Sequence, residues 1–266
     1  MRHPVPGDPP VPTPAHAARA VVTGAGRGFG RAIAAALVAS GTRVVGIART
    51  APDLHALRDE LGDAFTPLPA DAADEVLAAD VLARHRPTLL VLNAGALPHL
   101  APLHEHTWES FSSAWHTDTR HVFAWTRAAL RAPLAPGSAV VVISSGAALG
   151  GSPLSGGYAG AKATVRFTAA YAAEEAERAD LGIRFTTLFP HLAPATGVGA
   201  TAIAAYAARR GQDSATFTTA LEPVLTPERL AAAVLHAATD PDHTRGLREH
   251  VVTGRGTGLH PVPATR

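Results

Sequence analysis

A tyrosine and a lysine four residues apart are the residues of this sequence whose spacing points most directly to chemistry. Lys162, four positions after Tyr158, is the only lysine among the 23 basic residues. Positions i and i+4 share one face of a helix, so the phenol and the ammonium would lie side by side. A nearby cation lowers a phenol pKa, ~10 in isolation, by about 1–3 units and eases proton exchange. We therefore expect Tyr158 to transfer a proton; the alternative is an ordinary pair on a surface helix.

A second cluster is a glycine-rich turn that follows a short apolar run and opens an alanine-rich helical stretch. Glycines allow a tight turn and close approach of the backbone to a pyrophosphate, while a helix start offers free N–H groups. The position of the turn predicts a dinucleotide site, the alternative being a turn without ligand; no Gly-Lys-Ser/Thr sequence supports a P-loop. The residues are Thr23, Gly24, Ala25, Gly26, Arg27, Gly28, Phe29 and Gly30.

The end of the second apolar run bears on which dinucleotide binds. Enzymes that use NAD usually place an acidic residue there, to bind the ribose 2′-hydroxyl group. Here Ala48 takes that place, Arg49 follows it, and Arg27 lies within the glycine turn. Two guanidinium groups can flank a 2′-phosphate, which favours NADP (NADPH); two solvated surface arginines are the alternative. Asp53 fits better as part of a helix cap with Thr50 than as a ribose ligand.

Positioning these residues requires a scaffold, and the chain alternates apolar runs with helical stretches. Runs that are apolar throughout are typical of strands covered on both faces. The alternation implies crossover connections and a parallel sheet. We expect an α/β fold with one Rossmann-type domain, a doubly wound parallel sheet of about seven strands and helices on both faces. Expected strands are Ala20–Thr23, Arg43–Ala48, Thr66–Pro69, Leu89–Asn93, Ala139–Ser144, Arg184–Phe189 and Glu249–Thr253; expected helices are Gly28–Ser40, Pro52–Leu61, Asp74–His85, Thr107–Arg131, Gly157–Ala179 and Pro227–Ala238.

Three segments do not follow this alternation. Residues 1–16 contain six prolines and are predicted to form a disordered tail. The domain would span residues 17–256, and residues 257–266 would form a C-terminal tail. Within the domain, residues 191–222 surround one short helical piece, Thr201–Arg210, with glycines. Because they follow a strand end on the ligand side, we expect a substrate lid, with a poorly structured insertion as the alternative.

Composition excludes several classes of protein. The 266 residues carry a formal net charge of +1, which gives no indication of a nucleic acid or membrane partner. The chain has no cysteine, so disulfides, thiolate metal sites and a cysteine nucleophile are excluded. No apolar run approaches the ~18 residues of a membrane helix, and no signal peptide is recognisable. We expect a cytoplasmic protein.

Two other catalytic chemistries find little support. His104, Glu105 and His106 are the densest cluster of possible metal ligands, but spacing places no third ligand, so we expect no metal. Neither Ser144 nor Ser145 lies in the Gly-x-Ser-x-Gly elbow of a serine hydrolase.

Taken in order, these motifs resemble the short-chain dehydrogenase/reductase family over roughly residues 18–256. The glycine turn and the Tyr-x-x-x-Lys pair both match family motifs. Ser145, thirteen residues before Tyr158, matches the catalytic serine, with Ser144 as the neighbouring alternative. Further matches are Asp71, for the acidic residue that contacts adenine, and Asn93, Ala94 and Gly95, for the motif that closes the fourth strand beside the adenosine ribose.

The resemblance implies an NADP-dependent oxidoreductase that acts on a ketone or similar carbonyl of a small-molecule substrate. Ser145 would hydrogen-bond the carbonyl oxygen, and Tyr158 would protonate that oxygen during reduction or remove the proton during oxidation. Lys162 would bind the nicotinamide ribose and hold the phenol at a reduced pKa. The coenzyme itself carries the hydride chemistry.

Three positions depart from the family pattern. Asp118 replaces an asparagine that holds a water behind Lys162 in a proton relay, and His121 replaces a glycine one turn later. Pro190 is followed by His191 instead of glycine, which puts a ring near the expected place of the nicotinamide amide. Two alternatives therefore stay open: an isomerase, epimerase or dehydratase on the same fold, and a coenzyme-binding subunit with little turnover.

Family position also suggests the substrate pocket and the assembly. The pocket would suit a mainly apolar substrate, and no arginine stands out for a carboxylate. The helices Thr107–Arg131 and Gly157–Ala179 would pair with their copies in a homodimer or homotetramer, with Val165, Phe167 and Tyr171 available for contact. The expected pocket residues are Leu97, His99, Ala147, Leu149, Leu154, His191 and Leu192.

Overall fold

The computed structural model describes residues 18–255 and 259–262. One eight-stranded sheet has the order β3-β2-β1-β4-β5-β6-β7-β8, and every neighbouring pair is parallel except β7 with β8. The strand order reverses between β1 and β4, where doubly wound sheets bind ligands at the carboxyl ends of their strands. This architecture confirms the predicted fold class. The strands are β1 (Arg19–Thr23), β2 (Arg43–Ala48), β3 (Phe65–Pro69), β4 (Leu89–Leu92), β5 (Ala139–Ile143), β6 (Arg184–Pro190), β7 (Gly246–Val252) and β8 (Leu259–Pro261).

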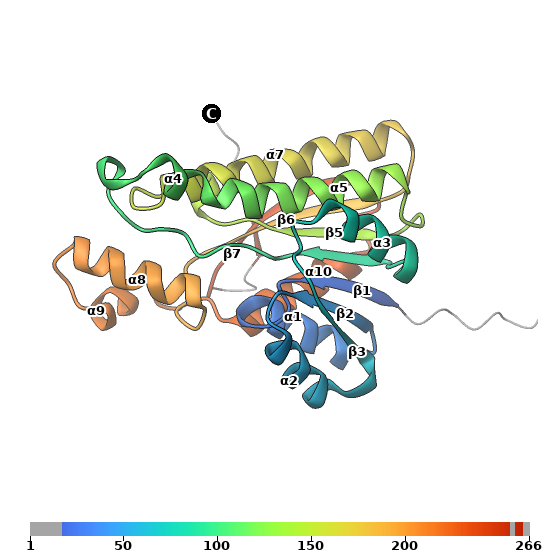
Figure 1. The fold of residues 1–266 in the computed structure, drawn as a ribbon, viewed down its shortest axis with the longest axis horizontal. Helices are drawn as coiled ribbons and strands as arrows, with labels where there is room; N and C mark the ends of the chain where they lie inside the picture. The colour runs from blue at the N-terminus through green and yellow to red at the C-terminus, as the bar shows by residue number, and fades with distance from the viewer. Residues whose placement is uncertain (1–17, 256–258, 263–266) are drawn as a thin grey trace, which may run out of the picture.

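Helices cover both faces of the sheet (Figure 1). Successive strand residues point to opposite faces, so Val21 packs with the helices α3, α5 and α7 while Ala20 and Val22 pack with α1 and α10. Every residue of β4 and β5 is buried, which explains their unbroken apolar sequences. The helices of these layers are α1 (Gly28–Ala39), α2 (Ala51–Leu61), α3 (Glu75–His85), α5 (Arg120–Arg131), α7 (Gly156–Arg178) and α10 (Pro227–Thr239).

The helix predicted over Thr107–Arg131 is interrupted in the structure. Helix α4 (Trp108–Ala114) leads into a π-helical turn, η3 (Trp115–Thr119), before α5 begins. A π turn places one more residue in the turn than an α-helix does, and such turns are frequent at functional sites. Asp118 lies in this turn and is completely buried. The predicted stretch is thus helical from Trp108 to Arg131, but the sequence did not indicate the π turn that contains Asp118.

The segment expected to be a lid contains two helices, α8 (Gly197–Arg209) and α9 (Ser214–Thr219), of which only the first was predicted. They extend from one end of the sheet (Figure 1) and share a small core of Ile203, Ala207 and Phe217. The short helix α6 (Ala147–Gly150) follows β5.

Of the two predicted tails, the structure describes part of the C-terminal one only. The N-terminal tail lies outside the described residues. Strand β8 falls within the predicted C-terminal tail and adds an eighth, antiparallel strand to the sheet. None of the described helices has the length and apolar character needed to cross a membrane.

Candidate active site

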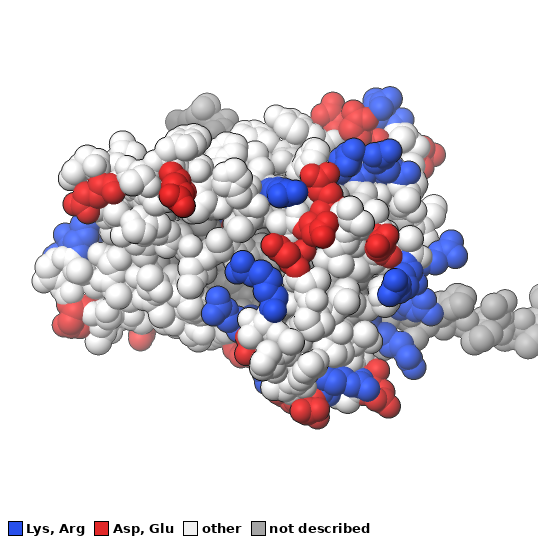
Figure 2. Space-filling model, in the orientation of Figure 1, with Lys and Arg blue, Asp and Glu red and all other residues white. Residues whose placement is uncertain are grey.

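A cavity of about 980 Å³ opens at the carboxyl ends of the central strands. It extends from the glycine turn past Tyr158 to the lid helices, and Figure 2 shows basic side chains at the rim of a hollow between α1 and the lid. Cofactor and ligand sites generally measure ~300–1,000 Å³. The cavity is therefore large enough to be considered as a joint site for coenzyme and substrate.

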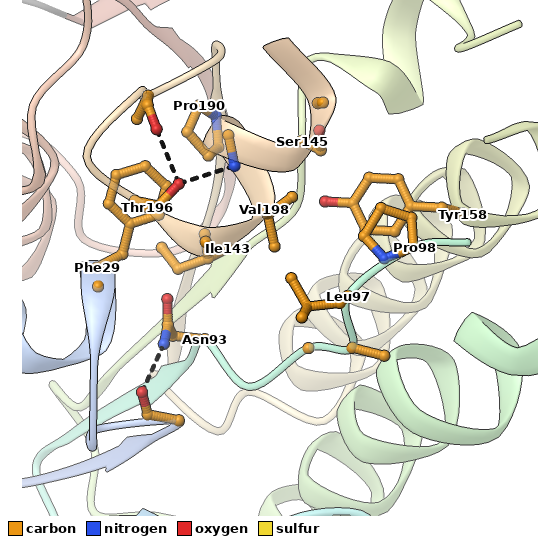
Figure 3. A pocket seen from close by; sticks show the side chains of 18 of the residues that line it. Phe29, Asn93, Leu97, Pro98, Ile143, Ser145, Tyr158, Pro190, Thr196 and Val198 are labelled. Atoms are coloured by element: carbon orange, nitrogen blue, oxygen red, sulfur yellow. Dashed lines mark hydrogen bonds between the residues drawn. The ribbon is translucent and has the colours of Figure 1, made fainter. Parts of the chain in front are cut away.

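The glycine turn is shaped by close backbone contacts. Gly24 has φ +68°, and a Cβ there would lie 2.9 Å from the Cα of Ala94. A Cβ on Gly30 would lie 2.0 Å from the Gly24 carbonyl oxygen, so only glycine allows α1 to start this close to the turn. The Asn93 side-chain amide donates to the carbonyl oxygens of Thr23, at 3.0 Å, and Gly24 (Figure 3). These contacts join the ends of β1 and β4.

Most residues predicted to bind coenzyme lie along one half of the cavity. Thr23 and Gly30 do not line it: Thr23 is fully buried, and its hydroxyl accepts hydrogen bonds from the main-chain N–H groups of Asn93 and Ala94. These two residues support the turn from behind. The residues that do line the cavity are Gly24, Gly26, Arg27, Gly28, Phe29, Arg49, Asp71, Asn93, Ala94, Gly95, Tyr158, Lys162 and Pro190.

The charge at this end of the cavity suits a phosphate. Arg27 and Arg49 are exposed at the cavity wall, and neither has an ion-pair partner among the described residues. Helix α1 has no acidic residue in its first turn and no side-chain cap, so its first N–H groups remain available to an anion. The expected cap by Thr50 and Asp53 was wrong, because Thr50 makes no side-chain cap hydrogen bond and Asp53 lines the cavity.

The Tyr158 hydroxyl points across the cavity toward Ser145 (Figure 3). Helix α7 carries Tyr158 and Lys162 one turn apart, with Lys162 Nζ 5.7 Å from the centre of the phenol ring. Ser144 is buried, and its hydroxyl donates to the Lys162 main-chain oxygen at 2.9 Å. Both serines line the cavity, but the Ser144 hydroxyl is bonded to the main chain of α7, whereas the Ser145 side chain faces Tyr158.

Asp118 contacts Lys162 directly. Its Oδ2 lies 3.0 Å from Lys162 Nζ, and both side chains are almost completely buried. Its Oδ1 accepts hydrogen bonds from the main-chain N–H of Ala96 at 2.8 Å and from the Thr117 hydroxyl at 2.9 Å. Lys162 Nζ also donates to the Ile143 carbonyl oxygen at 3.3 Å. The aspartate is thus held in place by the β4 loop and the π turn, and it fixes the ammonium behind Tyr158.

These contacts set the protonation of the site. Burial acts to lower the pKa of Lys162, but attraction to Asp118 and Tyr158 outweighs burial and raises it. Burial raises the pKa of Tyr158, and Asp118 adds to this effect, whereas Lys162 and Ser145 act in the opposite direction. The net direction is opposite to the reduced pKa of Tyr158 that the resemblance implied, because burial and Asp118 outweigh Lys162 and Ser145. A phenol that stays protonated at neutral pH is suited to donating a proton.

The two unusual histidines carry no charge that competes with Lys162 near neutral pH. His121 is buried with its ring edge toward Trp125, and burial lowers its pKa to about 3. Burial also lowers the pKa of His191. The His191 ring packs over the backbone at Gly146, where a Cβ would lie 3.3 Å from the His191 Cδ2 atom.

The predicted substrate pocket is only partly assembled. Leu97, Ala147, His191 and Leu192 line the cavity, whereas His99, Leu149 and Leu154 do not. The His99 ring packs instead against that of His106, 5.2 Å away. Leu154 is buried, and its main-chain N–H donates to the Tyr206 hydroxyl, so the neighbouring backbone supports the lid.

The lid supplies cavity residues that sequence reasoning missed. The sequence set residues 191–222 apart from the strand–helix alternation but gave no indication of which face of their helices points inward. Four of these cavity residues recur every fourth position along α8, a helical periodicity that the sequence does contain. The residues of this segment that line the cavity include Val198, Ala202, Tyr206, Arg210, Phe217 and Leu221, and Arg255 lines it from the end of β7.

The chain is similar to known dehydrogenases and reductases. Residues 18–205 match the short chain dehydrogenase family. The NADP-dependent 3-hydroxy acid dehydrogenase YdfG of Salmonella typhi is 32% identical over 233 residues, which cover 84% of this chain and 90% of that protein. The L-xylulose reductase of Bos taurus is 35% identical over 125 residues, 47% of this chain and 51% of that protein.

The share of each relative that the chain covers differs. The chain spans about half the length of the xylulose and erythrulose reductases that it matches. A crystal structure of 3-ketoacyl-(acyl-carrier-protein) reductase from Brucella melitensis, complexed with NADH, has a TM-score of 0.73 at 23% identity, covering 89% of this chain and 97% of that chain. That likeness concerns the fold. The chain therefore belongs to the short-chain dehydrogenase/reductase family of NAD(P)-dependent oxidoreductases, as its motifs predicted.

Proposed function

We propose that this protein is an NADP-dependent oxidoreductase that reduces a ketone or similar carbonyl to an alcohol, or catalyses the reverse reaction. The observation that carries the proposal is the Tyr158 hydroxyl facing Ser145 across the cavity, with Lys162 behind it. The names of the relatives, which include an NADP-dependent dehydrogenase and sugar reductases, support carbonyl chemistry. NADPH, when bound, supplies the hydride to the carbonyl carbon.

The residues of the chain would bind the coenzyme, orient the substrate and transfer the proton. Gly24, Gly26 and the free N–H groups of α1 would hold a pyrophosphate, because glycines let the backbone approach it closely. The Ser145 hydroxyl donates a hydrogen bond to the carbonyl oxygen, which orients and polarises it. Tyr158 donates its proton to the same oxygen as negative charge develops there. Lys162 hydrogen-bonds the nicotinamide ribose and stabilises the resulting phenolate.

The proposal is tested by mixing the protein with NADPH and a panel of ketones and aldehydes while following absorbance at 340 nm. Loss of absorbance with one alcohol formed per NADPH is the expected result. Product formed without net oxidation of NADPH would indicate an isomerase, epimerase or dehydratase. NADPH binding without reaction on any carbonyl would indicate a coenzyme-binding subunit.

Arg49→Ala is expected to weaken NADPH binding by about ten- to a hundredfold and to leave NADH binding unchanged. The lost charge-assisted contact to the 2′-phosphate is worth on the order of 1.5–3 kcal/mol. Fluorescence titration of both coenzymes measures the effect. Arg43→Ala is the matched control, since Arg43 is exposed at the opposite end of β2. Equal affinity of the wild type for the two coenzymes would contradict the assignment to NADP.

We also propose a homodimer or homotetramer formed through the outer faces of α5 and α7, which lie side by side (Figure 1). Phe167 and Tyr171 on α7 are 52% and 63% exposed, and Phe123 on α5 is 47% exposed. Aromatic side chains grouped in this way are typical of interface cores. Val165, which the sequence suggested for this contact, is buried within the subunit.

Light scattering at micromolar concentration should give a mass of two or four times 27.3 kDa. Phe167→Asp combined with Tyr171→Asp should shift the protein to the monomer, because two charges would be buried without partners. Val76→Asp replaces an equally exposed apolar residue on α3 and should leave the assembly intact. A wild-type monomer would refute the interface.

A further inference from the structure

The lid helix α8 presents one face to the cavity. The Tyr206 hydroxyl lies 2.5 Å from Ser152 Oγ and 3.2 Å from the main-chain nitrogen of Leu154, so this face is held against the loop that precedes Tyr158. Arg210 follows Tyr206 by four residues, at the end of the helix, and therefore lies on the same face one turn further out. Both residues line the cavity.

The guanidinium group of Arg210 keeps its charge available. It lies 5.1 Å from the centre of the Phe217 ring, and among the described residues it has no ion-pair partner. Arg255 also lines the cavity; it donates to the main-chain oxygen of Glu222 and has no ion-pair partner among the described residues. Arg210 therefore offers an unpaired cation on the face of α8 that lines the cavity.

The carboxylates of the cavity lie elsewhere. Asp53 follows β2, Asp71 follows β3, and Asp118 is bound to Lys162. No carboxylate of the described lid helices lines the cavity, and the residues of α8 and α9 that line it are apolar apart from Tyr206 and Arg210. The Ser152 hydroxyl meets Tyr206 from the loop before α7. A neutral, apolar substrate would gain nothing from these charges. An anion at this place would gain charge-assisted hydrogen bonds from a planar guanidinium group.

We propose that the carbonyl substrate carries an anionic group, a carboxylate or a phosphate, that binds Arg210 at the lid end of the cavity, with Arg255 adding to the positive potential. The anion takes no part in the chemical step; it positions the carbonyl between Ser145 and Tyr158. This inference rests on the proposed carbonyl reduction and specifies its substrate class. It differs from the expectation that no arginine stands out for a carboxylate.

The test compares oxo acids of increasing chain length with their methyl esters, and with oxo phosphates of matching length. The wild type should have a kcat/KM at least about tenfold higher for the anionic member of the best pair. Arg210→Gln should lower kcat/KM for that anion by about ten- to a hundredfold and leave the ester unchanged, whereas Arg210→Lys should retain much of the preference. Whether the carboxylate or the phosphate is preferred identifies the anion.

Arg209→Gln is the matched control, since Arg209 is the exposed neighbour that does not line the cavity. Three results would overturn the inference: equal rates for acid and ester in the wild type, equal losses for both in Arg210→Gln, or weaker NADPH binding in that variant. Equal losses would mean that Arg210 acts only by packing on Phe217. In each of these cases carbonyl reduction itself would still stand. A wild type that reduces no carbonyl would instead refute the proposed function, and the inference with it.

Discussion

Replacing Tyr158 with phenylalanine should lower kcat for carbonyl reduction by about 10²–10⁴-fold, the usual contribution of a positioned proton donor. The phenyl ring keeps the volume of the side chain and its place 5.7 Å from Lys162 Nζ, so NADPH should bind nearly as well as in the wild type. Single-turnover absorbance at 340 nm measures the chemical step, and fluorescence titration measures coenzyme affinity.

Tyr171→Phe provides the matched control, because Tyr171 is exposed on the outer side of the same helix. It should leave kcat unchanged. A Tyr158→Phe variant that kept a kcat within about tenfold of the wild type would show that another group protonates the substrate oxygen.

Replacing Asp118 with asparagine should reduce the free energy of unfolding by about 3–5 kcal/mol, because the change leaves the buried ammonium of Lys162 without a countercharge. The pKa of Lys162 is raised above the value of an unperturbed lysine, ~10.4, so the ion pair contributes fully below that pH and its contribution is lost as pH rises through the folded value. The stability curves of wild type and variant should therefore converge in strong alkali. Urea unfolding at several pH values measures both effects, with the exposed Asp80→Asn on α3 as control.

The same variant should shift the pH dependence of catalysis. Asp118 raises the pKa of Tyr158 and Lys162 lowers it, so removing the carboxylate should move the basic limb of the oxidative pH–rate profile to lower pH. Measurement at saturating NADP keeps the variant folded by mass action. An unchanged profile, with Tyr158→Phe inactive, would mean that Asp118 takes no part in proton transfer. In that case Asp118 would only stabilise the fold.

Local patterns in the sequence were sufficient to predict the sheet and the helices that cover it. Strands β4 and β5 are apolar throughout because both faces are covered, and the glycine turn is recognisable because side chains at Gly24 and Gly30 would clash with the backbone. The i, i+4 spacing of Tyr158 and Lys162 needs only a continuous helix to place the two groups together. Each of these signals depends on neighbours in the sequence or on strong steric exclusion.

The features that the sequence did not reveal depend on contacts between distant segments. The π turn around Asp118 is stabilised by contacts with Ala96 and Lys162, which no periodicity within the helix could indicate. The direction of the Tyr158 pKa depends on burial in the assembled cavity. The sequence alone does not distinguish Arg210 from a surface arginine, because the hydrogen bonds of Tyr206 determine which face of α8 points inward.

Transfer of deuterium from the nicotinamide ring of labelled NADPH to a carbonyl substrate tests the central claim most directly. The reaction would be run in ordinary water with NADPH carrying deuterium on one or the other face of C4, and the alcohol analysed by mass spectrometry and NMR. One of the two labelled coenzymes should give an alcohol with a single deuterium on the former carbonyl carbon, matched by one NADP formed. An alcohol free of deuterium with both coenzymes, or no consumption of NADPH, would contradict it.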